Sequence, residues 1–129
     1  MDAGFANLGY PPFTTSWGST ELVELYKSAD IFVLPSFKEA GACLSMLEAL
    51  AAGLPVVASD TPEVREGLAD CGVLIQDPTA INYAKALDAI LSNKDTLREL
   101  RTLSVQKARS YSWQKLLDAL ESVYKEIQS

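Results

Sequence analysis

The sequence lacks histidine and contains only two cysteines, Cys43 and Cys71. Without histidine the chain cannot form a Ser-His or Cys-His nucleophile pair, and it offers no imidazole as a general base or metal ligand. Two cysteines alone cannot build a zinc site. No secretory signal precedes them, so we expect reduced thiols in a cytoplasmic protein. We therefore expect neither a metal site nor a bound cofactor.

Long apolar runs and an excess of positive charge are also missing. The longest apolar stretch is interrupted by Gly53 and Pro55 and is too short to cross a membrane, so we expect no transmembrane segment. A net charge of −6 argues against nucleic acid and against an anionic membrane surface as partners, because both require clustered Lys and Arg. With 48% hydrophobic residues among 129, the chain is typical of one globular domain with a sizeable core.

The chain divides into two regions by composition. Residues 1–18 contain two prolines, three glycines and a single charge, which predicts a loop-like N-terminal segment. In residues 19–129, short apolar segments predict three buried strands, at 30–35, 54–58 and 72–75. One helix is expected before the first strand, at about 19–28. Two more are expected between the strands, at 43–52 with Gly53 as the C-cap and at 62–67 with Gly67 as the end. This alternation indicates an α/β fold, a partial Rossmann-like parallel sheet with flanking helices.

The last third of the chain predicts a helical C-terminus. One helix opens after Asp77-Pro78, a second covers about 95–109, and a third follows Ser112, which can cap it. The first of these helices has its apolar residues on one side, namely Ile81, Ala84, Leu87, Ile90 and Leu91. In the last helix we expect the apolar residues to face inward, namely Trp113, Leu116, Leu117, Leu120, Tyr124 and Ile127. Trp113 is expected to pack at the start of the last helix.

The segment after the first predicted strand is the richest candidate for a ligand site. Ligands of open parallel sheets bind at the carboxyl ends of the strands. After Leu34 the small residues 40–42 lie where a helix begins, and free backbone N–H groups there favour an anion. Glu48 is either a solvated helix carboxylate or an acceptor for the hydroxyls of a ligand. Glu39, on the loop, is either a surface charge or a carboxylate that contacts a ligand.

Several separated motifs carry a resemblance to a known family. Residues 25–36 read LYKSADIFVLPS, a Glu-bearing loop follows, and residues 47–59 read LEALAAGLPVVAS. Together with Pro62-Glu63-Val64, residues 71–75 and Tyr111-Ser112-Trp113, they resemble the carboxyl-terminal half of retaining, GT-B fold glycosyltransferases of family 4, the group 1 glycosyl transferases. The resemblance covers about residues 19–129. It implies a domain that binds a nucleotide sugar (a UDP-, GDP- or ADP-sugar) and takes part in transferring the sugar to an acceptor hydroxyl, with retention and no required metal.

The resemblance also implies site residues. In the family, two glutamates separated by seven residues mark the donor site, and Glu48 matches the second, which contacts the donor ribose. Ser36, Gly41, Ala42, Cys43 and Leu44 would complete the donor-binding residues, of which the small residues 41–44 would face the sugar and phosphates. Glu39 is the candidate for the first, catalytic glutamate, but eight residues separate it from Glu48, and strict spacing would place Ala40 there. Either the loop carries one extra residue and Glu39 still reaches the sugar, or that contact is lost.

The family's amino-terminal half is not among these 129 residues, nor are the first strands of the donor-binding domain with their basic residues. Lys38 is the only cation of the loop. We therefore expect the isolated chain to be inactive. The open edge of the strand at 31–34 could be covered by the missing half, by residues 1–18 folding back as a short edge strand, or by a second copy, and we expect the homodimer. An alternative is a non-catalytic module that binds a nucleotide or a partner. A flavodoxin-like phosphoacceptor is disfavoured, because Asp30 lies at the wrong end of its strand.

Overall fold

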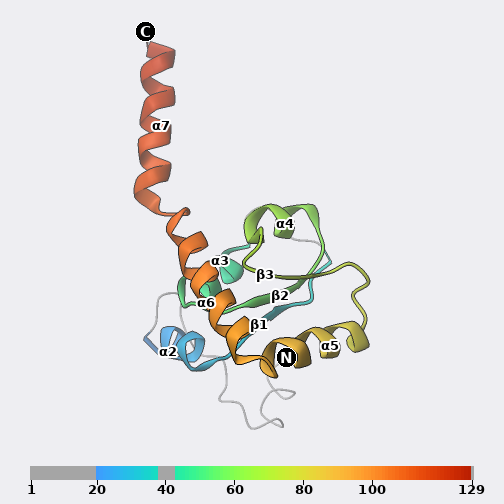
Figure 1. Ribbon diagram of the computed structural model, residues 1–129. Helices are drawn as coiled ribbons and strands as arrows, with labels where there is room; N and C mark the ends of the chain where they lie inside the picture. The colour runs from blue at the N-terminus through green and yellow to red at the C-terminus, as the bar shows by residue number, and fades with distance from the viewer. Residues whose placement is uncertain (1–19, 38–42, 129) are drawn as a thin grey trace, which may run out of the picture.

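The structure, a computed structural model, describes residues 20–37 and 43–128. The predicted loop-like segment 1–18 and the loop residues Glu39, Gly41 and Ala42 lie outside these residues. The described elements follow one another as α2 (Thr20–Ser28), β1 (Phe32–Leu34), α3 (Leu44–Ala51), β2 (Val56–Ser59), α4 (Pro62–Leu68), β3 (Gly72–Ile75), α5 (Ala80–Leu91), α6 (Lys94–Arg109) and α7 (Trp113–Gln128) (Figure 1). The predicted order of helices and strands is therefore confirmed.

The three strands form one parallel sheet in the order β1-β2-β3. Val57 of β2 lies between Val33 of β1 and Val73 of β3, and all four residues of β2 are buried. A strand covered on both faces has no solvent side, which explains why its sequence is continuously apolar rather than alternating. The prediction of an α/β fold with a three-stranded parallel sheet and flanking helices is confirmed.

The core consists of two clusters, one on each face of the sheet. Val56 and Ala58 of β2 belong to a cluster that includes residues of α3 and α4, whereas Val57 belongs to a cluster with Ile90 of α5. Successive side chains of a strand point to opposite faces, so β2 contributes to both clusters. Helix α6 contributes partly buried residues to each cluster and packs against α3 and α5.

Helix α5 buries only part of the side on which its apolar residues lie. Ile90 is buried and Leu87 half-buried, but Ile81 and Leu91 are 67% and 53% exposed, and Ala84 is exposed as well. Tyr83 lies on the packed face instead. Its hydroxyl lies 2.7 Å from Ser59 Oγ at the end of β2, so this polar tip has a partner inside the fold, and the helix can turn its aromatic residue inward.

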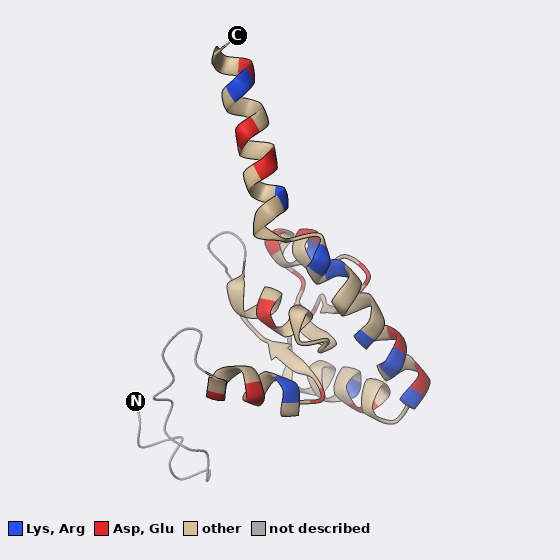
Figure 2. Ribbon diagram, turned by 90° about the vertical axis from the view of Figure 1, so that its left-hand side faces the viewer, with Lys and Arg blue, Asp and Glu red and all other residues tan. Residues whose placement is uncertain are grey.

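The largest departure from the sequence-based expectation is α7. All of its residues are exposed, Trp113 at 78%, and the helix projects away from the sheet and its covering helices (Figures 1 and 2). The expected inward packing of its apolar residues, and of Trp113 at its start, is therefore wrong. The amphipathic pattern correctly predicted a helix with an apolar face, but such a pattern does not specify what covers that face. Ser112 does cap the helix, since its Oγ accepts a hydrogen bond from the N–H of Lys115 at 3.3 Å.

Two predicted helix ends are shifted. Ala52 is the C-cap of α3, and Gly53 follows it at φ 77°, a left-handed conformation that favours glycine. Helix α4 continues through Gly67 to Leu68 and ends at Ala69, which has φ 49°. A Cβ on Gly67 would lie 2.6 Å from Met46 Cε, so this glycine provides room for the contact between α3 and α4.

Candidate functional site

The carboxyl ends of the three strands differ in whether their polar groups have hydrogen-bond or ion-pair partners. After β2, Asp60 Oδ1 lies 2.8 Å from Nη2 of Arg65. After β3, the backbone carbonyl of Asp77 accepts a hydrogen bond from the Asn82 side-chain amide at 2.8 Å. After β1, the Ser36 side chain makes no hydrogen bond to any residue that the structure describes. Of the three ends, the one after β1 therefore has a polar side chain without a hydrogen-bond partner among residues 20–37 and 43–128.

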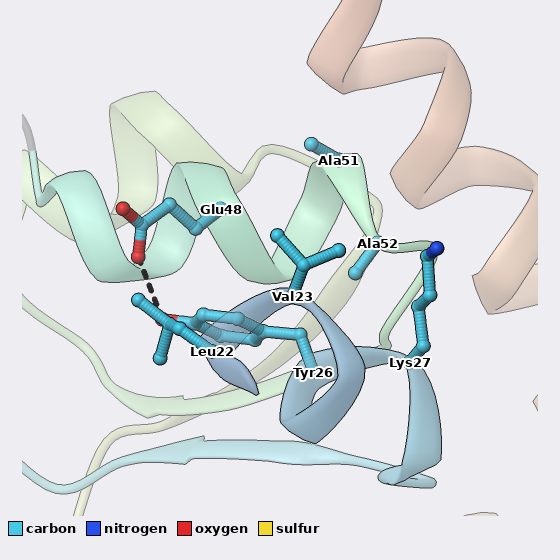
Figure 3. Close-up of a pocket in the computed structure, with 7 residues that line it drawn as sticks. All are labelled: Leu22, Val23, Tyr26, Lys27, Glu48, Ala51 and Ala52. Atoms are coloured by element: carbon cyan, nitrogen blue, oxygen red, sulfur yellow. Dashed lines mark hydrogen bonds between the residues drawn. The ribbon is translucent and has the colours of Figure 1, made fainter. Parts of the chain in front are cut away.

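Glu48 lies in the second turn of α3 and is half-buried against α2. The hydroxyl of Tyr26 donates a hydrogen bond to Glu48 Oε2 at 2.8 Å (Figure 3). Burial, together with the Glu48 carboxylate, raises the pKa of the Tyr26 phenol, which therefore stays protonated and remains a donor. The second carboxylate oxygen of Glu48 points away from the Tyr26 hydroxyl. Glu48 is thus a held carboxylate rather than a freely moving surface charge, and its second oxygen makes no hydrogen bond within the described residues.

A cavity of about 300 Å³ lies beside this pair, between α2 and α3. Its lining residues are Leu22, Val23, Tyr26, Lys27, Glu48, Ala51 and Ala52 (Figure 3). Apolar walls with a few polar groups are typical of small-molecule sites, and this volume is at the lower end of their range. Sequence analysis missed the α2 side of this site. The signal was a tyrosine within the apolar stripe of α2, because a buried phenol hydroxyl usually has a polar partner.

Two of the predicted site residues, Cys43 and Leu44, lie at the start of α3. Cys43 is the N-cap and makes no capping hydrogen bond with its side chain, so its thiol does not satisfy the first N–H groups of α3. Leu44 is exposed and lies one turn before Glu48, on the same face of the helix. Cys43 instead lines a second cavity of about 290 Å³, with Met46, Leu47, Glu63, Glu66, Gly67 and Tyr111. Its thiol therefore faces a different side of α3 from Glu48.

Both cysteines are buried and free. Cys43 Sγ lies 3.3 Å from Ser45 Oγ, and the Cys71 thiol donates a hydrogen bond to the carbonyl of Leu68 at 2.6 Å. Burial raises the pKa of the Cys71 thiol, which keeps it in the unreactive protonated form. Cys71 is therefore a packing residue, as its buried position suggests.

Two further classes of site are not found in the described part of the chain. Residues 20–37 and 43–128 contain no group of three or more Asp, Glu or Cys side chains placed to hold a metal ion. Within the same ranges, no helix has the length and apolar character needed to cross a membrane.

The fold is similar to that of a solved sucrose-phosphate synthase from Thermosynechococcus elongatus, with a TM-score of 0.74. The similarity covers 83% of this chain and 27% of that protein at 24% sequence identity, so it concerns the fold alone.

Curated relatives are similar at the sequence level. A D-inositol 3-phosphate glycosyltransferase of Corynebacterium diphtheriae is 34% identical over 106 residues, which are 81% of this chain and 25% of that protein. An O-antigen chain mannosyltransferase B of Escherichia coli is 34% identical over 119 residues, 92% of this chain and 29% of that protein. The chain therefore spans about a quarter of the length of these relatives. The family model described as glycosyl transferases group 1 matches residues 13–111, a range that includes α2, Glu48 and every strand. The chain belongs to the group 1 glycosyl transferases.

Proposed function

We propose that these residues form the donor-binding part of a retaining glycosyltransferase, which transfers a sugar from a nucleotide sugar to an acceptor hydroxyl. The observation that carries the proposal is the state of Glu48: half-buried, with one carboxylate oxygen bonded to Tyr26 and the other pointing away from it. An ionised carboxylate accepts hydrogen bonds only, and it can accept two from adjacent hydroxyls of a ribose. The glycosyltransferase names of the relatives support the reaction class.

In this proposal the donor extends from the cavity beside Glu48 along the start of α3. The ribose hydroxyls bond to Glu48, and the diphosphate lies near the uncapped N–H groups that follow Cys43. Ser36 and Leu44 border this region, and the small loop residues Gly41 and Ala42 allow the sugar to approach the backbone. Glu39 is the proposed catalytic carboxylate, which contacts the transferred sugar. The donor is a UDP-, GDP- or ADP-sugar, and the two free cysteines support a cytoplasmic location.

We expect the 129-residue chain to bind its donor weakly by itself and to transfer no sugar. Glu63 and Glu66 line the cavity beside Cys43, and among the described residues Lys27 is the one cation that lines either of the two cavities. Charge-assisted hydrogen bonds to phosphate are about twice as strong as neutral ones, and their shortage leaves an affinity no better than about 1 mM. The acceptor would be bound by the amino-terminal half of the enzyme.

The test is titration of the isotope-labelled chain with UDP, GDP and ADP, followed through backbone amide shifts. We expect the largest shifts between Ser36 and Glu48, and a several-fold rise in Kd for Glu48→Ala. Glu99→Ala removes an exposed carboxylate from α6 and serves as the matched control, with an unchanged Kd. Shifts centred on another surface, no shifts at about 10 mM of any of the three nucleotides, or equal loss in both variants would contradict the proposal.

A further inference from the structure

Tyr26 occupies an unusual position for a tyrosine on a surface helix. Its ring packs against the core cluster on one face of the sheet, with its centroid 6.1 Å from that of Phe32. This packing fixes the direction of the ring, so the hydroxyl is carried to a defined point between α2 and α3. At that point it lies 2.8 Å from Glu48 Oε2 and 3.5 Å from the carbonyl oxygen of Ser45.

No other group in the described part of the chain holds the Glu48 carboxylate. Among residues 20–37 and 43–128, its side chain makes no hydrogen bond except that with Tyr26 and no ion pair. Lys27, the cation that lines the same cavity, lies with its Nζ 3.4 Å from Glu24 Oε1 instead. A free glutamate side chain samples many rotamers, and fixing it costs conformational entropy. Here the phenol of Tyr26 has already fixed it before any ligand binds.

We propose that Tyr26 is a positioning residue for Glu48: its hydroxyl holds Oε2 so that the other carboxylate oxygen is presented to the hydroxyls of the ligand. The inference rests on the proposed role of Glu48 in donor binding. Oε2 keeps a second lone pair, so the carboxylate can still accept from two adjacent ribose hydroxyls. Because the phenol stays protonated, it remains a donor throughout the neutral pH range.

If Tyr26 has this role, removing its hydroxyl should weaken only the binding of the ligand's hydroxyl groups. Tyr26→Phe keeps the ring and its contact with Phe32 but removes the donor, so the fold is preserved while the carboxylate is released. We expect a Kd for the best-bound nucleoside diphosphate that rises about threefold to tenfold, the equivalent of one hydrogen bond. We also expect the preference for that nucleotide over its 2′-deoxy form to shrink, because the loss concerns the ribose hydroxyls.

The experiment is a double-mutant cycle on nucleotide binding, measured by amide shifts on the chain and its Tyr26→Phe, Glu48→Ala and doubly substituted variants. If Tyr26 acts through Glu48, Tyr26→Phe has no further effect once Glu48 is alanine. Tyr124→Phe is the matched control: it removes the hydroxyl of an exposed tyrosine on α7 that lines neither cavity, and it should leave the Kd unchanged.

The outcomes separate this inference from the function on which it rests. A Tyr26→Phe variant that binds as tightly as the unsubstituted chain, or one that loses the same factor in the Glu48→Ala background, would overturn the role of Tyr26 alone. An unsubstituted chain that binds none of UDP, GDP and ADP would overturn the donor site and the positioning role together. Dispersed amide spectra for every variant show that a change in Kd does not come from unfolding.

Discussion

At the scale of single residues, the most constrained polar group outside the candidate site is the hydroxyl of Ser104. It is fully buried on α6, 2.9 Å from the carbonyl oxygens of both Leu54 and Leu100. Leu54 lies two residues before β2, so this hydroxyl ties α6 to the amino end of that strand. A serine in an otherwise apolar contact is therefore a structural linker, which hydrophobic periodicity alone does not predict.

Ser104→Ala should destabilise the fold by about 1–3 kcal/mol, because it takes a donor away from buried carbonyl oxygens that water cannot reach. The control is Ser122→Ala on α7, whose hydroxyl donates to the carbonyl of Asp118 at 2.9 Å on an exposed helix. That change should stay within about 0.5 kcal/mol. Urea unfolding of both variants measures the difference, and equal stabilities would show that the buried hydroxyl contributes nothing.

At the scale of elements, the spacing of β2 and β3 depends on a glycine. Gly72 opens β3, and a Cβ at this position would collide with the backbone carbonyl oxygen of Val56 in β2. A backbone atom within a paired strand cannot move aside, so the room between β2 and β3 depends on this glycine. Gly67 differs, because the atom that its Cβ would meet is the flexible end of the Met46 side chain.

Gly72→Ala should therefore destabilise the chain by about 2 kcal/mol or more, through a shift of β3 away from β2. Gly67→Ala should change the stability by no more than about 1 kcal/mol, since the gain in helix propensity offsets the displacement of Met46. Thermal unfolding of the two variants tests this order. A Gly67→Ala variant less stable than Gly72→Ala would show that the α3–α4 contact, and not the strand spacing, is the tighter one.

At the scale of the whole molecule, two surfaces are left without a partner in the described residues. Strand β1 pairs there with β2 alone, and Val33 at its centre is exposed. The apolar residues of α7 form the second surface, and they recur at spacings of three and four along its length: Trp113, Leu116, Leu117, Leu120, Val123, Tyr124 and Ile127. An open strand edge and an uncovered helix face both favour association with another chain.

We expect the isolated chain to form a concentration-dependent dimer, as the open strand edge already predicts. Leu120→Lys places a charge in the middle of the apolar face of α7 and should weaken the dimer about tenfold or more. Ser122→Lys, on a polar position of the same helix, should not. Sedimentation over a concentration series measures both. Association that Leu120→Lys leaves unchanged would assign the contact to the edge of β1, and a clean monomer at high micromolar concentration would contradict the prediction.

The sequence by itself determined the order of helices and strands, the parallel sheet and the family. Local signals were sufficient for these features: the continuous apolar run of β2 indicates a strand buried on both faces, and the motif around Glu48 stands in one contiguous segment. The run that forms β1 predicted a buried strand as well, but Val33 at its centre is exposed. Cys43 and Cys71 were also correctly predicted to be unpaired. Helix ends were predicted less accurately. The C-caps of α3 and α4 are Ala52 and Ala69, whereas the sequence predicted that these helices end at Gly53 and Gly67.

The tertiary structure alone decided which faces are covered and which groups meet. Periodicity shows that α5 and α7 have apolar faces, but the partner of a face is a matter of long-range packing. Tyr83, and not Ile81, therefore lies on the packed side of α5, and the apolar face of α7 is exposed. The meeting of Tyr26 with Glu48 has the same origin. These residues are 22 positions apart on separate helices, and no local pattern encodes a hydrogen bond that forms only when α2 and α3 pack side by side.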